Sequence, residues 1–172
     1  MSLARVRSLI VVGVLLVAAV VSVVTALVRD TASGAVPGAC AEGAPVADLT
    51  LPEGPDQVTV KVFNGSGRPG VADSLTTDFV NRRFRTEKPA KSKKKVDGVA
   101  LLRFGPEGVG SAQLVRALFL GDAETQYEAK RKGKVVEVVV GGGFRQLATF
   151  TEANQSLAQL GEPELPPGAC RA

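Results

Sequence analysis

The first pattern in the chain is an apolar stretch at residues 9–28, in which Ser22 and Thr25 are the polar side chains. At a helical rise of about 1.5 Å per residue, a stretch of this length spans roughly 30 Å, the thickness of the hydrocarbon core of a bilayer. Arg5 and Arg7 precede the stretch, which favours an N-terminus inside and a chain that continues outside. The pattern therefore predicts a single-pass anchor in the cytoplasmic membrane.

Two alternatives treat the same stretch as a targeting segment. A cleaved signal peptide has an apolar region of about 7 to 15 residues and a small-x-small site, whereas Leu27, Val28 and Arg29 end this stretch. A lipoprotein would use Cys40, but residues 36–39 match a lipoprotein signal poorly. The length of the stretch favours the uncleaved anchor.

The pattern changes twice between residues 58 and 81. Alternation of Val58, Val60 and Val62 with polar residues predicts a half-buried strand. The turn-forming run at 64–70 breaks this alternation. A period near four then predicts an amphipathic helix with three apolar positions: Val71, Leu75 and Phe79.

Further elements follow this helix along the chain. We expect strands at 84–87, 98–104 and 135–140, a weaker edge strand at 124–128, and a helix from Gly105-Pro106 to Gly121. The order strand, helix, strand, strand, helix, strand predicts an α+β fold, a split βαβ (β-α-β-β-α-β) two-layer sandwich behind the N-terminal transmembrane helix. Both helices are expected on one face of the sheet.

The end of the chain adds three expectations. The valine-rich strand at 135–140 is typical of a central strand, and Glu137 in it indicates a face that reaches solvent. Glycines 141–143 are expected to form a turn that approaches another backbone, or alternatively a ligand-facing loop. Thr151 is the expected N-cap of a last helix that ends at Gly161.

Composition limits the chemistry, because the chain contains no histidine. A Ser-His-Asp triad, a Cys-His pair and a histidine-rich zinc site are therefore excluded. Asp73 and Asp78 point in different directions on the predicted helix, and Ser66 and Ser111 have no candidate base nearby in sequence. We expect no enzyme activity, no catalytic residue, no cofactor and no metal.

The two cysteines, Cys40 and Cys170, lie near the ends of the segment predicted to be outside the cell. An oxidising exterior favours one intramolecular disulfide between them. Two free thiols or a bond between two chains are the alternatives.

Two basic clusters are the strongest charge features in a chain of net charge +4. One contains Lys91, Lys93, Lys94 and Lys95, and the other contains Lys130, Arg131, Lys132 and Lys134. Such clusters suit phosphate-bearing polymers or anionic lipid head groups. The alternative is a pair of solvated loops that keep the protein soluble. Nucleic acid is not expected, because no aromatic residues interleave with the lysines.

The run at 65–70 also fits G-x-G-x-x-G between a strand and a helix, with Glu87 downstream. In a nucleotide-binding fold, this loop would hold a pyrophosphate. Pro69 removes one amide donor, and the segment is too short for two mononucleotide-binding halves. A tight turn before a helix is the preferred interpretation.

The same turn carries a family resemblance through Asn64, Gly65, Ser66, Gly67 and Gly70. Together with the closing valine strand and its glycines, it resembles the LytR C-terminal domain (LytR_C) over residues 57–147. That family's long phosphotransferase region has no counterpart here, so the resemblance implies the accessory domain alone. The expected organisation is a cytoplasmic N-terminus at 1–8, a transmembrane helix at 9–28, an extracytoplasmic arm at 29–56, the LytR_C-like domain at 57–147, and at 148–172 an extension tied back by the disulfide.

The resemblance implies a non-catalytic extracytoplasmic module that supports the integrity of the cell envelope. Envelope proteins are its expected partners. An alternative is a binder of cell-wall glycan or anionic lipid through the basic loops, and a second alternative is a nucleotide-binding domain that uses residues 65–70.

Overall fold

The structure is a computed structural model that describes Cys40 and residues 43–171. The transmembrane segment predicted at 9–28 lies outside these residues and stays a prediction. Among the described residues, none of the helices has the length and apolar character needed to cross a bilayer. The described residues lie in one compact unit.

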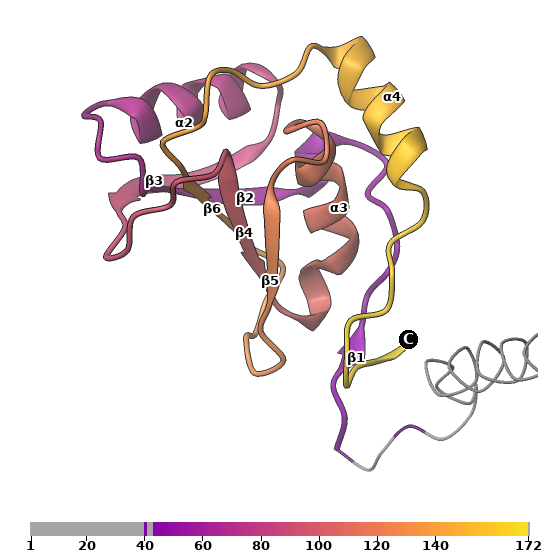
Figure 1. Cartoon of the computed structure of the whole chain (residues 1–172). Helices are drawn as coiled ribbons and strands as arrows, with labels where there is room; N and C mark the ends of the chain where they lie inside the picture. The colour runs from indigo at the N-terminus through magenta and orange to yellow at the C-terminus, as the bar shows by residue number, and fades with distance from the viewer. Residues whose placement is uncertain (1–39, 41–42, 172) are drawn as a thin grey trace, which may run out of the picture. The chain divides into compact units, whose positions relative to one another are not determined.

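One layer of this unit is a five-stranded sheet with the strand order β3-β2-β6-β4-β5 (Figure 1). Its strands are β2 (Thr59–Asn64), β3 (Arg85–Lys91), β4 (Ala100–Phe104), β5 (Glu124–Tyr127) and β6 (Val136–Val140). β2 runs parallel to both β3 and β6, β4 runs antiparallel to β6, and β5 runs parallel to β4. The valine-rich strand β6 is central, as its composition predicted.

The expected α+β class is confirmed, but the strand arrangement differs from a split βαβ sandwich. Helix α2 (Val71–Asn81) connects β2 to β3, and α3 (Val109–Ala117) connects β4 to β5. In each unit the two parallel strands are direct neighbours, and β6 lies between the two units. The arrangement differs from the expected one because β5, a short polar segment, pairs directly with β4. The sequence of β5 has no alternation of apolar and polar residues that would predict this pairing.

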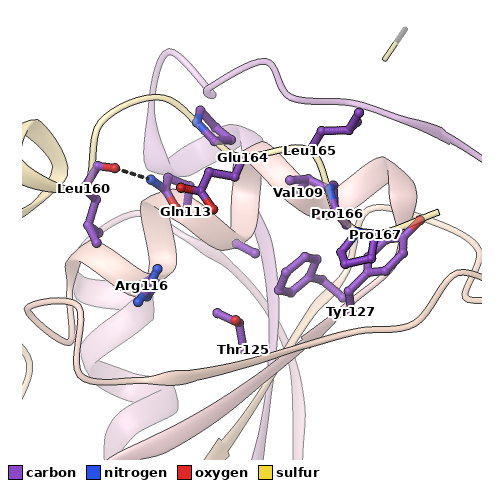
Figure 2. A pocket seen from close by; sticks show the side chains of 13 residues that line it. Val109, Gln113, Arg116, Thr125, Tyr127, Leu160, Glu164, Leu165, Pro166 and Pro167 are labelled. Atoms are coloured by element: carbon purple, nitrogen blue, oxygen red, sulfur yellow. Dashed lines mark hydrogen bonds between the residues drawn. The ribbon is translucent and has the colours of Figure 1, made fainter. Parts of the chain in front are cut away.

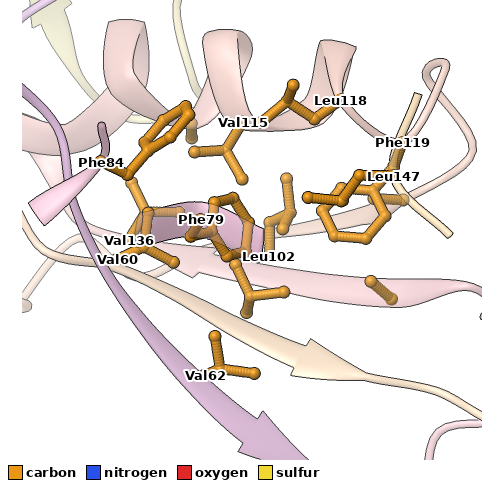
Figure 3. Close-up of a cluster of buried hydrophobic side chains, with 14 of the residues drawn as sticks. Val60, Val62, Phe79, Phe84, Leu102, Val115, Leu118, Phe119, Val136 and Leu147 are labelled. Carbon is orange, nitrogen blue, oxygen red and sulfur yellow. The ribbon is translucent and has the colours of Figure 1, made fainter. Parts of the chain in front are cut away.

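The core lies between one face of the sheet and helices α2 and α3 (Figure 3). Alternate strand residues supply the sheet side of the core: Val60, Val62, Leu102, Val136 and Val138. The apolar stripes of the helices supply the other side with Leu75, Phe79 and Val115, and Phe119 adds to it from the turn after α3. Phe79 contacts Phe84 edge-on, with ring centroids 5.2 Å apart. In α2 the buried stripe is Ala72, Leu75 and Phe79, whereas Val71 is half-buried.

Two element boundaries differ by several residues from the expected ones. β3 continues to Lys91, through a segment predicted to be a loop, because an edge strand tolerates Pro89. Helix α3 is preceded by the 3-10 turn η2 (Pro106–Gly108) and ends at Ala117, although Gly121 takes the expected positive φ of 84°.

The last helix, α4 (Phe150–Leu160), has Thr149 rather than the expected Thr151 as its N-cap, and therefore begins two residues earlier than that cap predicts. The Thr149 hydroxyl accepts from the backbone N–H of Glu152 at 3.4 Å, and the Glu152 carboxylate accepts from the backbone N–H of Thr149 at 2.7 Å. This capping box has the sequence signature Thr-x-x-Glu, which favours Thr149 over Thr151.

Replacing Thr149 with alanine is expected to reduce the free energy of unfolding by about 1 kcal/mol, because the first turn of α4 loses its cap. Urea unfolding of the parent and variant measures the difference. Thr151→Ala is the matched control and is expected to leave stability nearly unchanged. Equal losses in the two variants would contradict the assignment of the cap.

The segment before β2 packs on the body instead of forming a free arm. Strand β1 (Val46–Ala47) pairs with β7 (Cys170–Arg171), and the 3-10 turn η1 (Pro55–Gln57) leads into β2. Asp48 donates its backbone N–H to Pro106 at 2.9 Å and accepts from Gly110 at 3.1 Å. The predicted disulfide between Cys40 and Cys170 is confirmed, and it joins this segment to the tail.

Candidate functional site

The face of the sheet opposite the helices carries two rows of side chains. The strand register places Glu87, Lys61, Glu137, Arg103 and Gln126 in one row, and Ala90, Phe63, Val139, Leu101 and Glu124 in the next. The first row alternates in charge across its first four positions. The second row is apolar over its first four positions and ends in Glu124.

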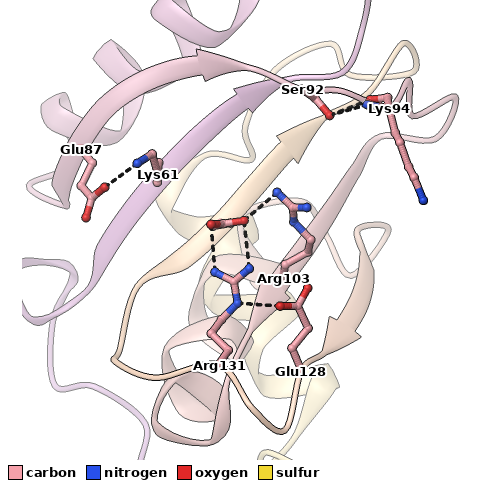
Figure 4. Close-up of polar contacts among 8 residues, drawn as sticks. Lys61, Glu87, Ser92, Lys94, Arg103, Glu128 and Arg131 are labelled. Atoms are coloured by element: carbon pink, nitrogen blue, oxygen red, sulfur yellow. Dashed lines mark hydrogen bonds and ion pairs between the residues drawn. The ribbon is translucent and has the colours of Figure 1, made fainter.

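Ion pairs neutralise most of the charged row (Figure 4). Lys61 lies 3.0 Å from Glu87, and Arg103 lies 2.6 Å from Glu137. Arg131, from the loop before β6, contacts both Glu137 at 2.9 Å and Glu128 at 3.0 Å. Its hydrogen bond with Glu137 is the main cause that raises the pKa of the Arg131 guanidinium. Glu137 lies on a face that reaches solvent, as predicted, and holds two arginines in place there.

Phe63, in the apolar row, contacts two cations of the charged row. The Arg103 guanidinium carbon lies 5.3 Å from the centre of the Phe63 ring, and the Lys61 ammonium lies 5.8 Å from it. Cations at these distances are attracted to the negative face of an aromatic ring. The buried Arg103 Nε has no hydrogen-bond partner among the described residues, so this guanidinium is not fully satisfied by its own chain.

The segment 91–98, here called the lysine loop, connects β3 to β4 across the ends of β2 and β6. Ser92 donates its backbone N–H to Asn64 at 3.0 Å, and Val96 donates to Gly65 at the same distance. Gly142 donates to the Val96 carbonyl at 2.8 Å. The loop is therefore tied to the backbone at the ends of both central strands.

A groove of about 460 Å³ lies between the lysine loop and the open face of the sheet. Phe63, Leu101 and Val96 give it an apolar floor, while Arg103 and Gln126 add polar groups. Its rim carries three exposed lysines that form no ion pair within the described residues: Lys91, Lys93 and Lys94. A groove with an apolar floor and an unpaired cationic rim suits a ligand that carries anionic groups.

The structure separates the basic residues that the sequence grouped together. Lys95 does not line the groove, and neither does any residue of the second cluster. Arg131 is held in ion pairs, Lys134 lies 3.3 Å from Asp48, and the rest of that cluster, Lys130 and Lys132, is exposed. Ligand binding by either cluster stays a prediction.

Sequence reasoning missed the floor of the groove, although a signal for it was present. The same alternation that buries Val60 and Val62 places Lys61 and Phe63 on the opposite face. Only the register across β6 and β4, however, brings Leu101 and Arg103 beside them.

The turn motif is held by its own side chains. The Asn64 side-chain oxygen accepts from the Ser66 N–H at 3.1 Å, and its amide donates to the Arg68 carbonyl at 2.6 Å. Gly67 and Gly70 have φ values of 74° and 77°, which favour glycine. The amides of Gly65, Ser66 and Arg68 all donate within the chain, so three donors that a pyrophosphate would need are already used. The turn therefore gives the nucleotide hypothesis no support.

Glycines 141–143 pack against the end of the lysine loop. Gly141 donates its backbone N–H to Val99 at 2.9 Å, and Gly143 donates to Gly98 at 3.0 Å. A Cβ on Gly141 would overlap the carbonyl oxygen of Gly98. The close approach to another backbone is confirmed, and this space is filled by the chain itself rather than by a ligand.

The comparisons with known proteins agree with this fold. No curated protein matches the chain. The crystal structure of the soluble domain of a conserved hypothetical secreted protein from Mycobacterium marinum matches with a TM-score of 0.53 and 23% sequence identity, covering 71% of this chain and 83% of that one. At this identity the likeness shows the fold alone. The family model described as LytR cell envelope-related transcriptional attenuator (LytR_C) matches residues 57–144, just over half of the chain. The chain therefore belongs to the LytR_C family.

Proposed function

We propose that this chain is a non-catalytic, extracytoplasmic module of the cell envelope, anchored by residues 9–28, that binds an anionic envelope component in the groove beneath the lysine loop. The observation that carries the proposal is the unpaired cationic rim of Lys91, Lys93 and Lys94 over the apolar floor around Phe63. The ligand would carry phosphate or carboxylate groups, supplied by wall glycan or by lipid head groups.

Several observations support the location. The Cys40–Cys170 disulfide suits an oxidising compartment. The family is described as cell envelope-related, and the matching solved structure belongs to a protein described as secreted. The turn motif and the single apolar segment also resemble the mycobacterial cell-envelope integrity protein Cei, and that resemblance favours a role in envelope integrity.

Charge removal at the rim tests the groove. Lys93→Ala combined with Lys94→Ala is expected to weaken binding of the detergent-solubilised full chain to purified wall polymer or to anionic vesicles. At about 1 kcal/mol for each lysine near an anionic surface, the loss is about 30-fold. Comparing the two ligands in sedimentation assays shows which source supplies the anionic groups.

The matched control combines Lys130→Ala with Lys132→Ala, which removes the same charge from exposed positions outside the groove. This variant is expected to bind within about threefold of the parent, because screening weakens the effect of distant charges. Equal losses in the two double variants would show that net charge, not the groove, drives binding. Unchanged binding in both, with capture of an envelope protein, would favour the protein-partner hypothesis instead.

A further inference from the structure

A second cavity, of about 610 Å³, lies on the helix side of the sheet (Figure 2). Its walls are α3, the strand β5 and the tail segment 163–167. This volume is within the range of about 300 to 1,000 Å³ typical of small-molecule pockets. The cavity shares no lining residue with the groove beneath the lysine loop, so it is a separate site.

The tail crosses this cavity as a bridge attached at both ends. At one end, Gln113 donates its side-chain N–H to the Gly161 carbonyl at 3.1 Å. At the other, Cys170 donates its backbone N–H to Pro45 at 2.8 Å and forms the disulfide with Cys40. Among the described residues, no hydrogen bond joins the tail at 162–168 to the body.

Proline stiffens the bridge. Pro163, Pro166 and Pro167 each have a fixed φ angle, and a turn follows in which the Ala169 N–H donates to the Pro166 carbonyl at 3.1 Å. Leu165 lines the cavity and remains 43% exposed. The cavity is partly open to solvent. The stiff tail, attached at both ends, forms one of its walls and is restrained from closing onto α3.

The lining combines apolar surface with hydrogen-bond donors. Phe104, Val109 and Ala112 form an apolar wall. The Arg116 Nε donates to the Gly121 carbonyl at 3.3 Å, but its guanidinium forms no ion pair among the described residues. The buried Tyr127 hydroxyl has no hydrogen-bond partner within the part of the chain that the structure describes, and burial raises the pKa of this phenol, so it stays protonated and can donate. Glu164, on the exposed tail, is the carboxylate at the rim.

We propose that this cavity binds an anionic amphiphile, with its apolar chain between α3 and the tail and its carboxylate or phosphate group beside Arg116. Figure 2 shows Arg116 toward one end of the cavity, and Tyr127 with Pro166 and Pro167 toward the other. A ligand with acceptor oxygens satisfies the unpaired guanidinium, and the apolar wall covers its hydrocarbon. Glu164 opposes the anionic group and limits the affinity.

Photolabelling locates the ligand directly. The full chain, in phosphatidylcholine vesicles, is irradiated with hexadecanoate that carries a diazirine in its chain, and the labelled peptides are identified by mass spectrometry. The proposed anchor at 9–28 takes up label from the bilayer, so labelling is compared among residues 43–171 alone, where we expect it to concentrate in α3, β5 and residues 160–167. Unlabelled hexadecanoate and hexadecyl phosphate are then compared as competitors, and the stronger competitor shows whether the site prefers a carboxylate or a phosphate. Equally strong competition by the cationic hexadecylamine would overturn the proposal.

Two variants test the charge. Arg116→Gln is expected to reduce labelling of the cavity about tenfold, while Arg145→Gln, an exposed control outside the cavity, keeps the parental level. Glu164→Gln, on the exposed tail, leaves the core untouched and is expected to raise labelling about two- to threefold, because a repulsive charge is removed. Label spread evenly over the molecule, or no rise with Glu164→Gln, would overturn the proposal even if Arg116→Gln failed to fold.

Discussion

Replacing Cys40 and Cys170 together with serine is expected to reduce the free energy of unfolding by about 3 to 5 kcal/mol. The two cysteines are separated by 130 positions, and the chain-entropy model gives roughly 5 kcal/mol for closing a loop of that length. The strands that the bond holds together, β1 and β7, have two residues each and supply little pairing of their own. The disulfide is therefore the main attachment of the end of the tail.

Tyrosine fluorescence measures this effect cleanly, because the chain has one tyrosine, Tyr127, and no tryptophan. Urea unfolding of the full chain is followed at that residue, with and without a reductant. The reductant is expected to destabilise the parent to the level of the double serine variant and to leave the variant unchanged. A difference below about 1 kcal/mol between parent and variant would show that the disulfide does not constrain the unfolded chain as the model assumes.

The same change has a consequence for the second cavity. Without the disulfide, the tail at 162–168 keeps its Gln113 attachment at one end, while the other end depends on the short pairing of β7. The wall that the tail provides is then free to move away from α3. Photolabelling of the cavity is therefore expected to fall in the serine variant while anion binding beneath the lysine loop is preserved.

Local sequence patterns predicted the parts of the fold that depend on local chemistry. The alternation of Val58, Val60 and Val62 and the helical spacing of Leu75 and Phe79 follow from one-sided burial, and the structure confirms that burial. The capping box at Thr149 also has a local signature, Thr-x-x-Glu, which lies two residues before the N-cap predicted at Thr151. These features need no knowledge of the rest of the chain.

Long-range pairings were not predictable from the same patterns. β5 is a short polar strand, and its place beside β4 depends on a neighbour about twenty residues earlier in the sequence. The basic clusters look alike in sequence, but Glu137 and Glu128 bind Arg131 in one of them. In the other, Lys91, Lys93 and Lys94 lie around the groove and form no ion pair within the described residues. The groove beneath the lysine loop arises from the register of the strands, and the second cavity arises from the position of the tail. Spacing in the sequence specifies neither of these.

Gly141→Ala is expected to reduce the free energy of unfolding by about 3 kcal/mol, near the upper end of typical overpacking losses. An added Cβ would overlap the Gly98 carbonyl oxygen and lie 2.9 Å from the Val96 carbonyl oxygen. Both neighbours are backbone atoms of the lysine loop, so the loop itself must move to admit the methyl group. Ligand binding in the groove is therefore expected to weaken together with stability.

The adjacent glycine is a control for this prediction. A Cβ on Gly142 would meet its nearest atoms at 3.8 Å, an ordinary contact, and this residue is exposed. Gly142→Ala is therefore expected to change stability by less than about 0.5 kcal/mol, as for other surface substitutions, and to keep parental binding. Urea unfolding and sedimentation with wall polymer compare the two variants. Equal stability and equal polymer binding in the Gly141→Ala and Gly142→Ala variants would contradict the prediction. The shape of the groove would then not depend on the close contact between the lysine loop and the end of β6.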